Sequence, residues 1–308
     1  MSEKRIIKLD ASALKESSCM RRLYWNVVEG WREATPNNDT EFGSAVHEYI
    51  KVMRLNPGRF DLATQAANER YSVPMRIKAK KQYMTKEYLI LVCQSLWLTY
   101  LSNDLFETVI VDGKPLVELK FSWPFYSDDD LEIILCGTID DVCKHKYGTY
   151  AIRDYKTTSV GESDTYLHGY YLSAQLLFYR LIIRYHALRY PDSIWGTLER
   201  QNTHCFIDGI FLRGASKPAE FIRSDIFSFD QAQLDEFEKL VKLATTELVY
   251  YLKQGTVPDR QGMLNDSCTT KFGPCKYFNA CKQPSLNAAQ RILANTYIQK
   301  PYDPLNFQ

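Results

Sequence analysis

The spacing of hydrophobic residues changes from a helical to a strand-like period partway along the chain. In the first third, apolar residues recur every three or four positions, which predicts helices over residues 11–28, 41–54, 61–71 and 85–101. From Leu116 the period becomes two, which predicts three antiparallel strands over residues 116–125, 131–144 and 149–157. Ser127 and the three aspartates at 128–130 are the expected turn between the first two strands.

Helix and strand signals alternate again in the rest of the chain. The pattern predicts a long aromatic-rich helix over residues 166–190, strands over 203–212 and 220–227, and a charged amphipathic helix over 230–253. A loop-rich cysteine segment follows Pro258, and few structural signals follow Pro284. Strands interspersed with helices predict an α/β fold, with a central mixed sheet flanked by helices. We expect one domain over residues 1–283, with a helical insertion at 57–105 and a C-terminal tail at 284–308.

Composition narrows the class of protein. The chain has 308 residues, of which 45% are hydrophobic, so it can bury a sizeable core. Its formal net charge is only +1, and nucleic-acid binding must therefore rely on local basic patches. No apolar run reaches the roughly 18 residues of a membrane span, and residues 1–10 lack the apolar block of a secretory signal, so we expect a cytoplasmic protein. The chain contains no G-x-x-x-x-G-K-[ST] motif, which excludes a helicase motor.

Two acids and a lysine stand where the predicted strands meet. Asp154 and Lys156 are two positions apart and project from the same face of a strand. Asp140 lies near the end of the preceding strand, across a turn at residues 145–148. Paired carboxylates suit Mg²⁺ or Mn²⁺, and a nearby ammonium stabilises charge on a phosphate. The alternative is that the acids cap turns and that Lys156 forms a surface ion pair.

Two helical pairs are further candidates. Gly43 and His47 are one helical turn apart and share a face, so the glycine would let the helix approach the sheet while the imidazole completes a metal shell. A packed or surface histidine is the alternative. Gln175 and Tyr179 share a face in the same way. One interpretation is that they form a hydrogen-bonding pair directed at Lys156 or at a DNA phosphate. The alternative is ordinary packing of the helix.

Two more acids lie close to these positions. Asp141 follows Asp140 directly. Because side chains alternate along a strand, the two acids must lie on opposite faces. Glu118 lies in the strand before and is either an additional metal-site acid or part of a solvated strand face.

Four short motifs, in this order, resemble the RecB-like branch of the PD-(D/E)xK nuclease superfamily: Gly43-x-x-x-His47, Gly137-x-x-Asp140, Asp154-x-Lys156 and Gln175-x-x-x-Tyr179. The chain is similar to the iron–sulfur members of that branch, which include CRISPR-associated exonucleases, helicase-linked nuclease domains and stand-alone phage exonucleases. The resemblance runs from Cys19 to Cys281 and implies a restriction-endonuclease-like core.

The resemblance also implies roles for the residues of these motifs. His47, Asp140 and Asp154 would bind Mg²⁺ or Mn²⁺, helped by the carbonyl of Tyr155, and Lys156 would support catalysis. Gln175 and Tyr179 would lie beside the site and act with the catalytic group. Some relatives carry glutamate where this chain has Asp154, and the shorter side chain changes the reach of that carboxylate.

Eight cysteines in a cytoplasmic chain favour metal sites or buried thiols over disulfides. Cys268, Cys275 and Cys281 have six and then five residues between them, with a Gly-Pro pair inside the first gap. A four-coordinate site needs a fourth ligand, for which Cys19 is the candidate. The remaining cysteines lie in apolar surroundings and are expected to be plain buried thiols: Cys93, Cys136, Cys143 and Cys205.

The surroundings of Cys19 resemble the CPRR(F/Y) stretch that supplies the first cluster ligand in the iron–sulfur nucleases, with Met20 in place of the proline. The resemblance therefore favours a [4Fe–4S] cluster. Zn²⁺ is the alternative occupant, because four thiolates suit it equally well. Either group would join the two ends of the domain, so we expect a structural role.

The basic residues expected to contact DNA phosphates are Arg21, Arg22, Arg76, Lys78, Lys80 and Lys81. A solvated basic face is the alternative for the segment that ends at Lys81.

The resemblance implies metal-dependent DNA hydrolysis, which we expect to be exonucleolytic on single strands or duplex ends. The expected setting is phage or bacterial recombination, replication or repair, together with a recombination or helicase partner. An endonuclease, a CRISPR spacer-processing nuclease and a non-catalytic, zinc-stabilised DNA-binding module are the alternatives.

Overall fold

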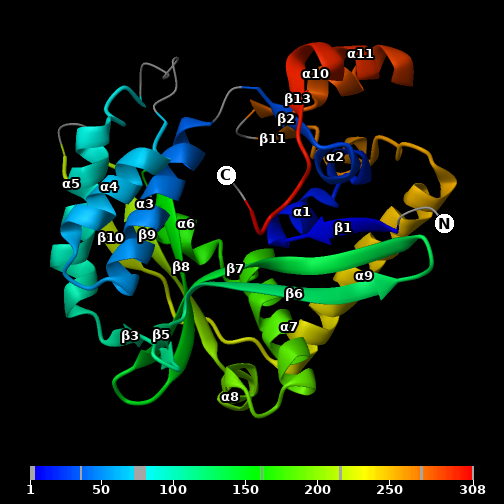
Figure 1. The fold of residues 1–308 in the computed structure, drawn as a ribbon. Coiled ribbons are helices and arrows are strands. Elements are labelled where there is room, and N and C mark those ends of the chain that lie inside the picture. Colours follow the sequence, from blue (N-terminus) through cyan, green and yellow to red (C-terminus); the bar gives the residue numbers. More distant parts are fainter. Residues whose placement is uncertain are drawn as a thin grey trace. The chain divides into compact units, whose positions relative to one another are not determined.

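A computed structural model describes residues 4–34, 37–72, 81–159, 161, 163–214, 217–270 and 273–306. The chain forms two compact units (Figure 1). The first unit comprises Met1–Ala34, Lys120–Gly137 and Asp230–Gln308. The second unit comprises Thr35–Leu119 and Thr138–Phe229. Each unit is therefore assembled from segments that are distant in the sequence.

The predicted α/β fold, with its central mixed sheet and flanking helices, is confirmed. Strand β7 (Leu131–His145) belongs to a seven-stranded sheet, and its first half pairs in parallel with β1 (Arg5–Leu9). Its second half pairs antiparallel with β8 (Tyr150–Thr158). The sheet continues from β8 through parallel β9 (His204–Phe211) to antiparallel β10 (Glu220–Arg223). Two further strands also pair with β7: β3 (Phe106–Thr108) and β6 (Val117–Ser127).

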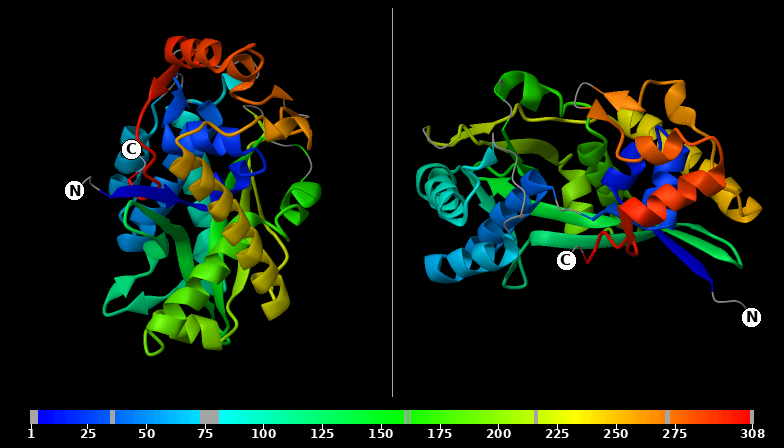
Figure 2. Two further views of the ribbon diagram at one scale, coloured as in Figure 1. Left: turned by 90° about the vertical axis from the view of Figure 1, so that its right-hand side faces the viewer. Right: turned by 90° about the horizontal axis from the view of Figure 1, so that it is seen from above.

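Helices of the second unit pack on one another and against its strands. Helix α3 (Asn38–Leu55) lies beside α4 (Phe60–Arg70), as Figure 2 shows, and also contacts α5 (Lys86–Ser95) and β8. Their apolar residues form a core with residues of the sheet that includes Phe42, Val46, Tyr49, Leu89, Tyr155 and Ile210. Helix α3 begins at Asn37, whose side chain accepts a hydrogen bond from the Asp39 amide. The remaining elements of this unit are α6 (Ser163–His168), α7 (Ala174–Arg189), α8 (Ile194–Arg200), β4 (Ile110–Val111) and β5 (Lys114–Pro115).

Helices of the first unit lie at both ends of the sequence. Helix α9 (Gln231–Gln254) is the longest, and a capping box formed by Asp230 and Gln233 begins it. The other helices are α1 (Ala11–Glu16), α2 (Met20–Leu23), α10 (Phe278–Cys281) and α11 (Leu286–Thr296). Two short strand pairs complete the unit: β2 (Trp31–Glu33) with β13 (Tyr297–Gln299), and β11 (Thr269–Thr270) with β12 (Gly273–Pro274).

Three predicted elements differ from the structure. The helix predicted over residues 11–28 is broken, because the Ser17 hydroxyl donates to the Leu14 carbonyl and Cys19 adopts an extended backbone before α2. The helix predicted over 166–190 is likewise two helices, since α6 stops before Gly169 and Ser173 caps α7. The segment after Pro284, predicted to have few structural signals, contains α11 and β13, with Ser285 as the helix cap.

Two glycines of the sequence motifs differ in how closely other atoms approach them. A Cβ atom on Gly43 would lie 3.7 Å from Thr157 Cβ, which is an ordinary contact, so the expected close approach of helix and sheet does not require glycine. A Cβ atom on Gly137 would lie 2.9 Å from the ring of Phe121, a residue that is only 4% exposed. Only the second position therefore has no room for a side chain.

Alanine at Gly43 should raise the free energy of unfolding by about 0.5–1 kcal/mol, because alanine restricts the unfolded chain and favours the helix. Valine at Gly137 should lower it by about 1–3 kcal/mol, because the Phe121 ring must leave its position. Urea unfolding of both variants measures the two effects. A stable Gly137→Val protein, or a strongly destabilised Gly43→Ala protein, would contradict the conclusion that a side chain fits at Gly43 but not at Gly137.

Candidate functional site

The backbone of one residue of β8, Tyr155, connects helix α3 to strand β7. The Tyr155 amide N–H donates to Asp140 Oδ2 at 2.9 Å, and the Tyr155 carbonyl accepts from His47 Nε2, also at 2.9 Å. The other ring nitrogen of His47, Nδ1, lies 3.4 Å from Asp140 Oδ2. The predicted residues His47, Asp140 and Tyr155 are thus neighbours, and each side chain is partly or largely buried.

Glu118 joins this group. One ligand atom from each of His47, Glu118 and Asp140 lies within 4.8 Å of the others, and in the described part of the chain this is the set of histidine, cysteine or acidic residues that meets that limit. Sequence reasoning left Glu118 as either a metal-site acid or part of a solvated strand face, and the structure places it with the other two. Its position depends on a positive φ angle of +50°, which a glutamate in the sequence does not predict.

Asp154 lies beside them on β8 and is fully buried, with both carboxylate oxygens engaged. Oδ2 is 2.6 Å from Lys156 Nζ. Oδ1 accepts from Gln175 Nε2 at 2.7 Å and from the Tyr179 hydroxyl at 3.2 Å. The sequence suggested that the Gln175 and Tyr179 pair faces Lys156 or a DNA phosphate, but the pair donates to the acid instead. Asp154 is therefore held in a fixed orientation from α7 as well as from its own strand.

Burial and neighbouring charges oppose each other at this site. Burial raises the pKa of Asp140 to about 7; the His47 and Lys156 charges act to lower it, and the Asp154 and Glu118 carboxylates raise it further. Burial acts to lower the pKa of Lys156, but the carboxylates of Asp154 and Asp140 outweigh burial and raise it. Lys156 is therefore a cation at neutral pH. An acid with such a raised pKa, close to other carboxylates, is typical of a functional site and suits a cation.

Asp141 points to the other face of β7, as the alternation of side chains predicts. Its Oδ2 lies 3.4 Å from Arg153 Nη1 and 3.8 Å from Arg54 Nε, and it accepts a hydrogen bond from the Tyr155 hydroxyl at 3.4 Å. The side chains of Asp141 and Arg153 are both fully buried. Asp140 and Asp141 therefore belong to two different polar groups on opposite faces of one strand.

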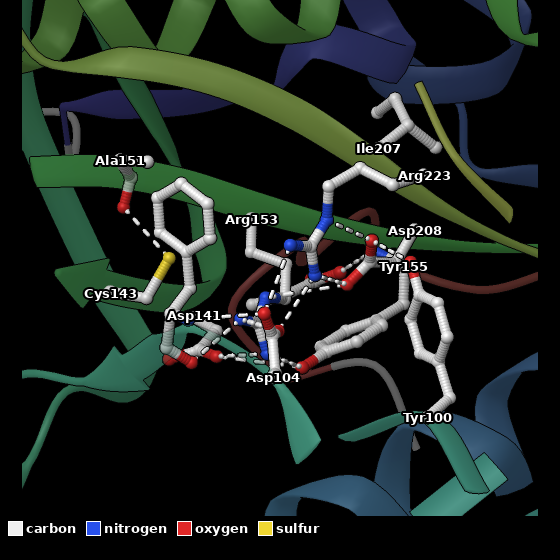
Figure 3. A network of polar contacts seen from close by, with 12 residues as sticks. Tyr100, Asp104, Asp141, Cys143, Ala151, Arg153, Tyr155, Ile207, Asp208 and Arg223 are labelled. Atoms are coloured by element: carbon white, nitrogen blue, oxygen red, sulfur yellow. Dashed lines mark hydrogen bonds and ion pairs between the residues drawn. The ribbon is translucent and has the colours of Figure 1, made fainter. Parts of the chain in front are cut away.

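Figure 3 shows the charge network to which Asp141 belongs. Arg153 contacts Asp104 and lies 3.4 Å from Asp208. Arg223 donates to the same two acids, at 2.9 and 2.7 Å to Asp104 and at 2.8 and 3.0 Å to Asp208. Tyr100 donates to Asp208 at 2.8 Å. With Arg54 included, three guanidinium groups face three carboxylates, so the buried charges balance.

Tyr155 belongs to both groups. Its backbone atoms hold His47 and Asp140, whereas its hydroxyl accepts from Arg153 at 3.1 Å within the charge network. The ring is 2% exposed, and burial raises the pKa of the phenol to about 12, so the hydroxyl stays protonated. The network therefore anchors the residue whose peptide groups position the site.

The four cysteines predicted as cluster ligands line one pocket in the first unit. Cys19 reaches this pocket from the N-terminal segment, and Cys268, Cys275 and Cys281 reach it from the C-terminal segment, together with Arg22, Ser267, Tyr277 and Phe278. The other four cysteines, Cys93, Cys136, Cys143 and Cys205, are fully buried elsewhere, as predicted.

The predicted DNA contacts have different surroundings. Arg21 is buried, and its Nε donates to the Pro258 carbonyl at 2.6 Å, so a phosphate contact by this residue stays a prediction. Arg22 donates to the Ser18 hydroxyl at 2.8 Å, and Lys81 pairs with Asp39. Arg76, Lys78 and Lys80 lie outside the described residues.

Replacing Tyr155 with phenylalanine should lower the free energy of unfolding by about 1–3 kcal/mol, because Arg153 and Asp141 lose a buried hydrogen-bond partner. Divalent-metal affinity should change by no more than about twofold, since the backbone atoms that hold His47 and Asp140 remain. Chemical denaturation and titration calorimetry measure the two quantities.

Tyr49→Phe is a matched control, because the buried Tyr49 hydroxyl has no hydrogen-bond partner among the described residues and its loss should not destabilise the protein. Equal stability of Tyr155→Phe and Tyr49→Phe would contradict the anchoring role of the Tyr155 hydroxyl.

Comparison with known proteins identifies the family of the chain. No described helix is both long and apolar enough to cross a membrane. A search of curated proteins found no match to this chain. A family model for the PD-(D/E)XK nuclease superfamily matches residues 11–282, which include the cysteine pocket as well as the site on α3, β7 and β8. Nucleases of this superfamily use divalent metal ions to cleave DNA, and the histidine and acidic residues of the site agree with that chemistry. The chain belongs to the PD-(D/E)XK nuclease superfamily.

Proposed function

We propose that this protein is a Mg²⁺- or Mn²⁺-dependent deoxyribonuclease of the RecB-like branch that degrades DNA from its ends. The observation that carries the proposal is that His47 and Asp140 meet at the backbone of Tyr155, whose neighbours in the chain, Asp154 and Lys156, pair with each other and act on the charge of Asp140. These residues come from one helix and two strands, and they correspond to the motifs by which the sequence resembles that branch.

The donor set fits a hard divalent cation. Carboxylate oxygens of Asp140 and Asp154, the Tyr155 carbonyl and a His47 nitrogen are the donors we assign to the metal, and Mg²⁺ and Mn²⁺ prefer such oxygen-rich sets. Burial and then the Asp154 and Glu118 carboxylates raise the pKa of Asp140, and a bound cation would favour its ionised form. When bound, the ion supplies a Lewis acid for the phosphate and lowers the pKa of a bound water molecule.

The protein's own residues prepare this chemistry. Lys156 is cationic and only 23% exposed, so it offers an N–H donor and a positive charge in a site with little competing water. Gln175 and Tyr179 hold Asp154 by two hydrogen bonds, which fixes the direction of its second oxygen. His47 and Asp140 are positioned by backbone atoms of one residue, and their separation therefore varies little.

Asp154→Asn and Lys156→Ala should each reduce Mg²⁺-dependent hydrolysis of linear DNA by about a hundredfold or more, because each removes a charge from the site. Asp164→Asn, which changes an exposed acid on α6, is the matched control and should retain full activity. Gel assays with end-labelled DNA, with EDTA as the metal-free reference, measure the effect. A Lys156→Ala protein as active as the wild type would favour a non-catalytic DNA-binding module.

The choice of substrate tests the exonuclease assignment separately. An end-dependent enzyme should degrade linear single-stranded or duplex DNA and leave covalently closed circles intact. Cleavage of circular DNA at a rate comparable to linear DNA would instead favour an endonuclease. Specific trimming of short duplexes with overhangs would favour the spacer-processing alternative.

We also propose that Cys19, Cys268, Cys275 and Cys281 hold a structural [4Fe–4S] cluster. The four thiols line one pocket, and the resemblance of the Cys19 segment to that of the iron–sulfur nucleases supports the cluster over a single zinc ion. Gly262 borders the same pocket, where an added Cβ would lie 3.0 Å from Cys268 Sγ.

Cys275→Ser should lose the brown colour of the purified protein and unfold at a lower temperature, because the group that ties the N- and C-terminal segments of the first unit is lost. Cys136→Ala, at a buried thiol distant from the pocket in sequence, should keep the colour. Visible absorbance, iron and zinc analysis and thermal unfolding make the comparison. Stoichiometric zinc without iron in the wild type would favour the zinc alternative, and a stable, colourless, fully active Cys275→Ser protein would contradict a structural cluster.

A further inference from the structure

We propose that Glu118 is an additional metal ligand of the nuclease site, presented by a left-handed backbone conformation that its sequence does not favour. The proposal rests on the proposed metal-dependent function and adds a third carboxylate to Asp140 and Asp154. It begins from the backbone of Glu118, whose φ angle is +50° near the start of β6.

This conformation is not explained by the residue type. Four described residues other than glycine have positive φ angles: Asp112, Glu118, Asn202 and Asp266. Aspartate and asparagine tolerate the left-handed region because their short side chains hydrogen-bond to the nearby backbone, whereas glutamate lacks this compensation. The surrounding structure must therefore impose the conformation on Glu118, and such imposed strain gathers at functional sites.

The chain before Glu118 is fixed beside β7, the strand that carries Asp140. The amide of Val142, two residues after Asp140, donates to the Leu116 carbonyl at 3.0 Å. The Val142 carbonyl in turn accepts from the Val109 amide at 2.8 Å. A left-handed residue within an extended segment interrupts the alternation of side chains, as in a β-bulge. The interruption at Glu118 directs its carboxylate toward the Asp140 face.

The resulting separation suits ligands of one ion. Oxygen ligands lie about 2.1 Å from Mg²⁺, so ligand atoms on opposite sides of one ion are about 4.2 Å apart. The ligand atoms of His47, Glu118 and Asp140 lie within 4.8 Å of one another, so small side-chain adjustments bring all three to a common ion. Two partly buried carboxylates at this distance repel each other, and a divalent cation offsets that repulsion. The strained backbone thus holds Glu118 in an arrangement that a divalent cation would stabilise.

Metal binding without DNA provides the test. Titration calorimetry with MnCl₂ compares the wild type with Glu118→Gln, which keeps the side-chain shape but removes the charge, and with Glu118→Gly. Both variants should bind Mn²⁺ at least about tenfold more weakly. In EDTA, Glu118→Gly should unfold at an equal or higher temperature than the wild type, because glycine adopts a positive φ angle without strain and the acid repulsion is gone.

Asp112→Gly is the matched control, because Asp112 has a φ angle of +49° at a turn and takes no part in the metal group. It should leave Mn²⁺ affinity unchanged. Glu118→Gln binding Mn²⁺ within about threefold of the wild type would overturn the proposal while the nuclease function stands. A wild type that binds no Mn²⁺ and cleaves no DNA would refute the proposed function itself. A large loss of stability for Glu118→Gly in EDTA would show that Glu118 serves the fold instead.

Discussion

The peptide groups on either side of Tyr155 are the constraint on which the site depends. The amide N–H of this residue donates to Asp140, and its carbonyl accepts from His47. The backbone of one residue therefore joins strands β7 and β8 and helix α3. The Tyr155 hydroxyl extends into a buried network of three arginines and three aspartates. Burying six charges has a large desolvation cost, which their mutual pairing offsets only when the geometry is well defined. The network therefore favours one arrangement of these strands over others, and that arrangement sets the positions of the site residues on them.

The two faces of β7 and β8 divide these charges by purpose. Asp141 and Arg153 lie on the face where acids and bases balance, while Asp140 and Asp154 lie on the opposite face and Asp140 is close to Glu118. Neighbouring carboxylates repel one another, and an added cation offsets that repulsion. We therefore propose that Asp140 serves catalysis, whereas its neighbour Asp141 belongs to the buried charge network.

Sequence reasoning identified those parts of the site that depend on local spacing. The i, i+2 relation of Asp154 and Lys156 and the helical spacing of Gly43 and His47 follow from regular geometry. In the structure, Lys156 pairs with Asp154, and His47 lies beside Asp140. Glu118 was left undecided, because its orientation depends on a left-handed backbone that no residue type signals. The Gln175 and Tyr179 pair faces Asp154 rather than Lys156, since the rotation of α7 is set by packing. Residues such as Asp104 and Arg223 join only through tertiary contacts, which pattern analysis does not reveal.

The way the two units divide the sequence has a consequence for synthesis on the ribosome. The second unit ends at Phe229, whereas the first unit needs the segment that begins at Asp230. Contacts such as that between Lys8 and Asp303, at 3.0 Å, join residues that are 295 positions apart and are synthesised at different times. The unit with the proposed nuclease site can therefore begin to form while the N-terminal segment of the first unit still awaits its partners. Any group bound by Cys19 together with Cys281 is acquired only after Cys281 has been synthesised.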